Sequence, residues 1–94
     1  MKVSWRPRAL TDIEKIADYI AADDVAAADR MRDRIKRTAA MLSDHPALGR
    51  KGRMGETREL VVTGSPYLIA YRLTTRQVTI LRVIHGARDW PRRM

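Results

Sequence analysis

Hydrophobic positions in the first part of the chain change from a strand pattern to a helical pattern. Residues 2–5 (KVSW) alternate and contain strand-forming side chains, so we predict a short first strand that is ended by Pro7. Apolar residues then recur at the spacing of one helical face between residues 13 and 20. Thr11 and Glu14 fit a capping box, which predicts that the first helix begins at Thr11.

A second helical series of apolar residues runs from Ala28 to Leu42. Asp23 and Asp24 precede this series and offer a cap for its first backbone amides. We expect His45-Pro46 to end the second helix, because proline cannot continue a helix. The short link between the two series predicts an antiparallel helical hairpin.

The second part of the chain alternates between turn residues and short strand-forming runs. Residues 46–56 (PALGRKGRMGE) have no consistent period and three glycines, which indicates an ordered but exposed basic loop. Strands are expected at residues 58–63, 67–73 and 78–84, separated by turns short enough for antiparallel hairpins. The order β-α-α-β-β-β predicts a single α+β domain over residues 1–94. In this domain the helical hairpin packs on one face of a mainly antiparallel four-stranded sheet, because its apolar stripe needs a cover.

Charge and composition narrow the function classes. The chain has 19 Lys and Arg against 11 Asp and Glu, a net charge of +8. This excess favours a nucleic acid, a nucleic-acid-bound machine or an acidic protein as partner, although an Arg-rich surface without such a partner stays an alternative. The absence of cysteine excludes disulfides, thiol nucleophiles and Cys-based zinc sites. Without a signal-peptide core or a membrane-length apolar run, we expect a soluble cytoplasmic protein with no membrane partner.

Few residues offer catalytic or metal-binding chemistry. The two imidazoles, His45 and His85, have no metal-ligand spacing, so we expect neither a metal site nor a cofactor. Ser65, His85 and Asp89 could form a triad on paper, but Ser65 lies in a Gly-Ser-Pro turn and not in a nucleophile elbow. His85 ends the last predicted strand, where a structural hydrogen bond is more common than catalysis.

Basic residues of the loop and strands have both structural and binding interpretations. Residues 49–52 (GRKG) match the GXXG form that clamps phosphates in KH domains, but they lead from a helix into a strand and not between two helices. A simple glycine turn is therefore favoured. Arg72 and Arg82 interrupt the apolar alternation of their strands. Each either reaches a sheet edge, pairs with a carboxylate such as Glu59, or lines a groove.

Several segments carry a family resemblance through their order and spacing. An opening strand that ends in Trp5 is followed by DIEKIADYIA, LSDHPALGR, TRELVV, YLIAYRL and VTILRVIHGARDW. Together, over nearly the whole chain, these segments resemble the RelE/ParE superfamily of type II toxins. The stretches GETREL and HGARDW make the ParE branch the closer likeness.

The ParE resemblance implies a small basic toxin that traps DNA gyrase on cleaved DNA, as in plasmid stabilisation systems. It also implies a cognate antitoxin encoded beside the toxin, which we expect to be acidic, partly disordered and ParD-like, with a ribbon-helix-helix DNA-binding part. Operator DNA would then be reached only indirectly, through the antitoxin.

The RelE branch instead cuts mRNA in the ribosome, with cationic or imidazole side chains around the scissile phosphate. Such toxins often carry Arg just after the strand-end histidine and just after the tyrosine that opens the middle strand. Here those positions hold Gly86 and Leu68. The candidates for this alternative are His85, Arg88, Arg58 and Arg72. Because the set is incomplete, we favour a binding toxin with no catalytic residue; a non-toxic nucleic-acid-binding module is a third hypothesis.

Exposure and charge select candidate binding residues for the favoured hypothesis. The target-binding candidates belong to the basic loop and the C-terminal segment: Arg50, Lys51, Arg53, Arg88, Trp90, Arg92 and Arg93. An antitoxin helix is expected to lie along the helical hairpin, near Ile16, Tyr19, Ile20 and Met31. An antitoxin strand could also add to an exposed sheet edge, where backbone groups are unpaired.

Overall fold

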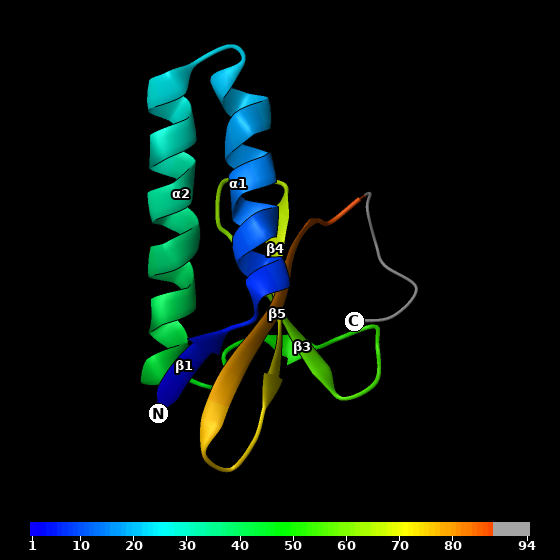
Figure 1. Ribbon diagram of the computed structural model, residues 1–94. Helices are drawn as coiled ribbons and strands as arrows, with labels where there is room; N and C mark the ends of the chain where they lie inside the picture. Colours follow the sequence, from blue (N-terminus) through cyan, green and yellow to red (C-terminus); the bar gives the residue numbers. More distant parts are fainter. Residues whose placement is uncertain (88–94) are drawn as a thin grey trace.

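A twisted five-stranded sheet and a hairpin of two helices make up the fold in the computed structural model (Figure 1). The structure describes residues 1–87. In chain order the elements are β1 (Lys2–Trp5), α1 (Pro7–Ala21), α2 (Val25–Ala40), a 3-10 turn η1 (Met41–Ser43), β2 (Arg50–Lys51), β3 (Thr57–Val61), β4 (Tyr67–Leu73) and β5 (Gln77–His85). The strands lie in the order β1-β5-β4-β3-β2, and all neighbours are antiparallel except β1 and β5, which are parallel. The predicted α+β class is confirmed.

The sheet has one strand more than the four that the sequence predicts. The additional strand is β2, in which Arg50 pairs with Glu59 and Lys51 pairs with Arg58 of β3. Only two residues form it, inside a glycine-rich stretch without periodicity, so no local pattern indicates it. Its order comes from pairing with β3, the next strand along the chain, and not from its own sequence.

The first helix begins earlier than predicted. α1 starts at Pro7, and Arg6 precedes it without any side-chain cap. Proline suits this first position because its fixed φ is already helical and its missing N–H would be unpaired there anyway. The predicted capping box is therefore wrong: the Thr11 hydroxyl instead donates to the Pro7 carbonyl one turn back, at 3.2 Å.

The second helix begins as predicted. The Asp24 carboxylate accepts a hydrogen bond from the Ala27 amide at 3.0 Å and caps α2. The helix ends at Ala40 and tightens into η1 before His45. None of the helices within residues 1–87 is long and apolar enough to cross a membrane.

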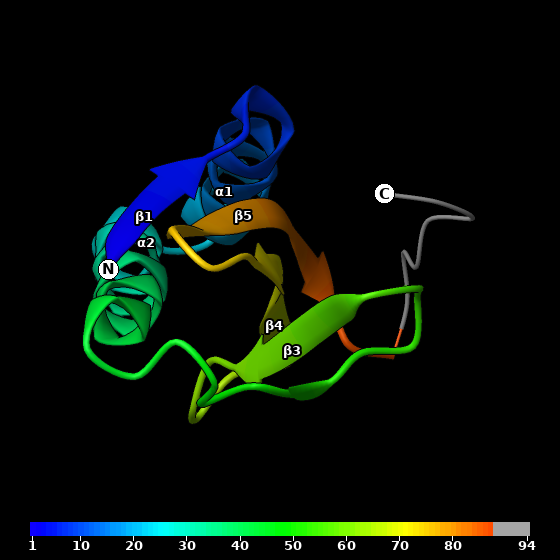
Figure 2. The same cartoon turned by 90° about the horizontal axis from the view of Figure 1, so that it is seen from below.

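The hydrophobic core lies between the helical hairpin and one face of the sheet. α1 and α2 lie side by side and antiparallel, and both views place them on the same side of β4 and β5 (Figures 1 and 2). Residues of α1, α2, η1 and the three long strands meet there, and the largest fully buried side chains among them are Ile13, Ile35, Leu42, Ile69, Tyr71 and Ile80. Residues 67–71 of β4 are all buried, so both faces of this central strand are covered.

Candidate functional site

A buried ion pair joins α1 to β5 at the place where β1 stops covering the edge of β5. Pairing between β1 and β5 ends at Trp5 and Ile80. Beyond it, Asp12 accepts two hydrogen bonds from Arg82, at 2.7 and 3.1 Å, and a third from the Val83 amide, at 3.0 Å. Of the alternatives left open for Arg82, the structure shows pairing with a carboxylate, and this carboxylate belongs to Asp12.

His85 lies in a groove beside this ion pair. The groove has a volume of about 320 Å³ and is lined by residues of α1, β4 and β5: Asp12, Lys15, Ile16, Tyr67, Arg82, Val83, Ile84 and His85. The His85 ring packs edge-on against the Tyr67 ring, with centroids 5.8 Å apart. Its Nδ1 accepts a hydrogen bond from the Ala87 amide at 3.1 Å. This bond assigns the proton of the neutral ring to Nε2 and gives the imidazole a structural role at the end of β5.

The alternative nuclease residues are not brought together within the described part of the chain. His85 pairs with Tyr67 at one end of β4, whereas Arg72 lies near the other end. At the rise of a strand, five residues of β4 separate these two levels by roughly 16 Å. Arg58 pairs with Tyr71, also at the far end, and its Nη1 donates to the carbonyls of Ala47 and Gly49. Arg88 lies outside the described residues.

Tyr71 fixes the start of the basic loop, here residues 46–56. Its hydroxyl donates to the Pro46 carbonyl at 2.8 Å and accepts from the Gly49 amide at 2.9 Å. A Cβ atom at Gly49 would lie 2.7 Å from the Tyr71 ring, so only glycine fits beneath this contact. Burial raises the pKa of the Tyr71 phenol, and the Gly49 hydrogen bond opposes this shift.

Glu59 fixes the middle of the basic loop. This residue is only 2% exposed, and its carboxylate accepts a hydrogen bond from the Arg53 amide at 2.8 Å. The Arg50 guanidinium lies 3.5 Å from the other carboxylate oxygen, while its side chain stays 64% exposed. Gly52 donates to the Thr57 carbonyl at 2.7 Å and closes the far end of the loop. The GRKG stretch is therefore a two-residue strand with a glycine on each side, held in place by β3, and not a KH-type link between helices.

Three of the seven target-binding candidates lie within residues 1–87, which the structure describes. Arg50, Lys51 and Arg53 are all exposed on the basic loop. Arg88, Trp90, Arg92 and Arg93 lie outside the described residues. Within residues 1–87, no group of three or more His, Asp or Glu is placed to hold a metal ion.

The four antitoxin-binding candidates differ in how much of each side chain is exposed. Tyr19 is 70% exposed, whereas Ile16 and Met31 are half-buried and pack against the core. Two further apolar residues at the surface of the hairpin escaped the sequence analysis, Leu10 at 46% and Val25 at 67% exposure. Leu10 was missed because the helix was expected to begin after it, and Val25 because it lies in the first turn, before the apolar series.

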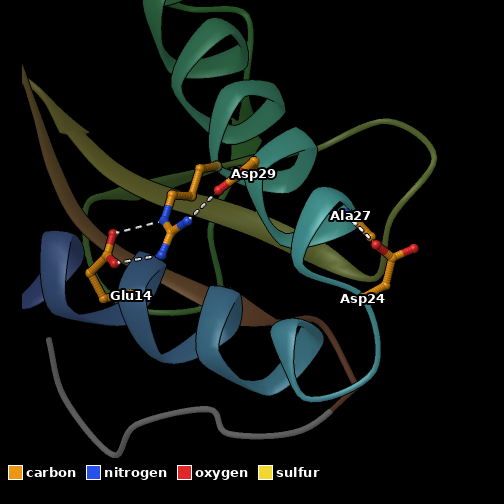
Figure 3. A network of polar contacts seen from close by, with 5 residues as sticks. Glu14, Asp24, Ala27 and Asp29 are labelled. Atoms are coloured by element: carbon orange, nitrogen blue, oxygen red, sulfur yellow. Dashed lines mark hydrogen bonds and ion pairs between the residues drawn. The ribbon is translucent and has the colours of Figure 1, made fainter.

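A charge network joins the two helices on their outer surface. Arg32 of α2 donates two hydrogen bonds to Glu14 of α1, at 3.2 and 2.9 Å, and one to Asp29 at 2.7 Å (Figure 3). The hydrogen bond from Arg32 lowers the pKa of the Glu14 carboxyl. The hairpin thus holds its two helices together by charge as well as by its core.

Comparison with known proteins shows which class of protein this sequence belongs to. The family model of the ParE toxin of the type II toxin-antitoxin system, parDE, matches residues 3–90. Putative toxin Y4kP of Sinorhizobium fredii is 43% identical over 90 residues, which is 96% of this chain and 93% of that protein. Toxin RelE2 of Caulobacter vibrioides is 41% identical over 87 residues, 93% of this chain and 97% of that protein.

A solved structure shares the fold. It is described as the chromosomal ParDE TA system from P. aeruginosa. One of its chains superimposes on this protein with a TM-score of 0.81 and 22% sequence identity, and the match covers 90% of this chain and 95% of that chain. Fold and sequence together define a small toxin of the RelE/ParE superfamily. The chain belongs to the ParE toxin family of type II toxin-antitoxin systems.

Proposed function

We propose that this toxin acts by binding DNA gyrase and holding it on cleaved DNA, without breaking bonds itself. The observation that supports this most is the placement of His85. Its Nδ1 is engaged by the Ala87 amide, and most of β4 separates the ring from Arg58 and Arg72. A nuclease needs charge-stabilising donors around one phosphate, and losing such donors typically costs about 100-fold or more in rate.

Contacts with the target belong, in this proposal, to the basic loop and the C-terminal segment. Arg50, Lys51 and Arg53 present positive charge on a backbone that Tyr71 and Glu59 hold in place. Residues 88–94 add three arginines and Trp90 to the candidates. Deleting residues 88–94 should abolish growth inhibition while circular dichroism shows an intact fold. A folded truncation that stays fully toxic would remove the C-terminal segment from the target surface.

A cognate acidic antitoxin neutralises the toxin in this proposal. The P. aeruginosa structure is described as a ParDE system, which supports a ParD-like partner for this chain. We place an antitoxin helix on the hairpin, over Ile16, Tyr19, Ile20 and Met31, of which Tyr19 is the most exposed. Binding should weaken with salt but persist, because apolar contacts contribute as well. An affinity lost entirely at moderate salt would argue against this mixed interface.

The name of the relative Toxin RelE2 supports a second candidate, the mRNA endonuclease acting in the ribosome that the RelE resemblance implies. One induction experiment separates the two candidates. The chain is expressed without its antitoxin while DNA breaks, supercoiling and transcript ends are followed. Gyrase-linked breaks with filamentation support gyrase as the target. Prompt translation arrest with cleaved messages supports the endonuclease and overturns the proposal, and an absence of growth inhibition overturns both.

A further inference from the structure

Within residues 1–87, the part that follows the helical hairpin carries nearly all of the excess positive charge. Residues 1–45 hold nine Lys and Arg against eight Asp and Glu, a net charge of +1. Residues 46–87 hold seven against two, a net charge of +5. A polyanion is therefore attracted to the strands and the basic loop more strongly than to the helical hairpin.

A hollow of about 350 Å³ lies within this positive part. Its lining is Lys51, Gly55, Glu56, Thr57 and Arg58. Lys51 and Arg58 are direct partners on the neighbouring strands β2 and β3, so their side chains leave the sheet on the same face. An ammonium group and a guanidinium group therefore border one hollow whose size accommodates a phosphate group. Glu56, an exposed carboxylate, borders the same space and opposes an anion there.

The backbone around the hollow is held by contacts that leave Lys51 at the surface. Only Nη1 of Arg58 donates to the carbonyls of Ala47 and Gly49, which fixes this guanidinium at the wall. On the other side, the Thr57 amide and hydroxyl both donate to the Met54 carbonyl. A surface already fixed in this way loses less conformational freedom when a ligand binds.

We propose that this hollow is a subsite for a backbone phosphate of duplex DNA, with Lys51 and Arg58 as its cations and Glu56 as a built-in limit on affinity. The choice of DNA rests on the proposed function, in which the toxin meets gyrase bound to DNA. Lys51 contributes a mobile point charge, and Arg58 a guanidinium of fixed orientation. Contacts of this kind bind all sequences alike and depend strongly on salt.

The test measures binding of the full chain to a short fluorescent duplex by anisotropy, over a series of salt concentrations. Lys51→Ala should weaken binding and make the log–log salt dependence shallower by about 0.9 for the one lost phosphate contact. Its matched control is Lys36→Ala, an exposed lysine on α2 with the same change in net charge. Glu56→Gln should bind several-fold more tightly than the wild type. Asp33→Asn, an exposed carboxylate on α2, is its control and should not.

Several outcomes would overturn the subsite. One is a Lys51→Ala variant with the same duplex affinity and salt dependence as Lys36→Ala. Another is a Glu56→Gln variant that binds the duplex no more tightly than the wild type. A third is a wild type that binds single-stranded RNA or an acidic peptide more tightly than the duplex. Gyrase supercoiling assays on the same variants keep the two proposals apart. A wild type that binds DNA as described but leaves gyrase active contradicts only the proposed function. A wild type that inhibits gyrase, with Lys51→Ala unchanged in DNA binding, contradicts only the subsite.

Discussion

Asp12 of α1 binds the guanidinium of Arg82 in β5 through two hydrogen bonds, although 70 positions separate the two residues. The Asp12 side chain is 9% exposed and that of Arg82 is 15% exposed. Removing the carboxylate therefore leaves a largely buried cation and the Val83 amide without their acceptor. We expect Asp12→Ala to lower the free energy of unfolding by about 3 kcal/mol.

Urea unfolding measures this loss, and Asp18→Ala, at an exposed position of the same helix, is the control. The control should stay within about 0.5 kcal/mol of the wild type. The double variant Asp12→Leu/Arg82→Met should recover stability relative to Asp12→Ala, because it removes both charges and fills the space. Equal stability of the Asp12→Ala and Asp18→Ala variants would rule out this role for the ion pair.

Gly49 should not tolerate a side chain. A methyl group there would meet the Tyr71 ring at 2.7 Å and the Glu59 carbonyl at 2.9 Å. We expect Gly49→Ala to cost about 1–3 kcal/mol, the usual range for overpacking. Gly86→Ala is the control, because its added Cβ would approach nothing closer than 3.4 Å. Thermal unfolding should separate the two variants by several degrees, and coincident melting curves would contradict the steric argument.

Ionisation of Tyr71 should destabilise the fold at alkaline pH. Burial raises the pKa of this phenol above its ordinary value of 10.0 in the folded chain. The folded state then binds more protons than the unfolded state above about pH 10, so stability falls as the pH rises through this range. Ultraviolet titration of tyrosinate should show one late phase that is missing from Tyr71→Phe. A titration curve identical in shape for both proteins would contradict this assignment.

Acid should weaken the link between the two helices. The hydrogen bond from Arg32 lowers the pKa of Glu14 below its ordinary value of 4.5. Its contribution to stability is therefore complete above about pH 4.5 and is lost as the pH falls through the lowered pKa. Carboxyl resonances in an NMR titration should show Glu14 moving back toward its ordinary pKa in Arg32→Gln. Because the pair is exposed, high salt should reduce the shift as well.

Replacing the strand-end imidazole should spare toxicity if the protein only binds its target. His85→Ala removes one hydrogen-bond acceptor and the ring packed on Tyr67, so we expect a small loss of stability and full growth inhibition. Plating efficiency after induction checks this outcome, with circular dichroism to confirm folding. A folded His85→Ala protein that no longer inhibits growth or cuts transcripts would favour catalysis over binding.

Local sequence patterns predicted an element well where interactions between residues close in the sequence determine it. The turns on either side of residues 67–73 give the bounds of β4, and Asp24 caps α2 because the Ala27 amide that its carboxylate accepts from lies within one turn. The errors arise where a segment has no pattern of its own and a neighbouring element decides its structure. β2 exists only because Arg50 and Lys51 pair with β3. For the site, exposure of the basic loop followed from its composition, but the Tyr71 and Glu59 contacts that shape it depend on tertiary structure.

The parallel pairing of β1 with β5 sets the order in which a newly synthesised chain can finish folding. Val3 pairs with Val78, so β1, the first strand to be synthesised, cannot pair until β5, the last strand, has been made. At about 5–20 residues per second, this wait lasts several seconds, during which the apolar face of the hairpin has no completed sheet beneath it. Completion of the sheet, and with it the cover over the apolar face of the hairpin, is therefore one of the last events in the folding of a newly made chain.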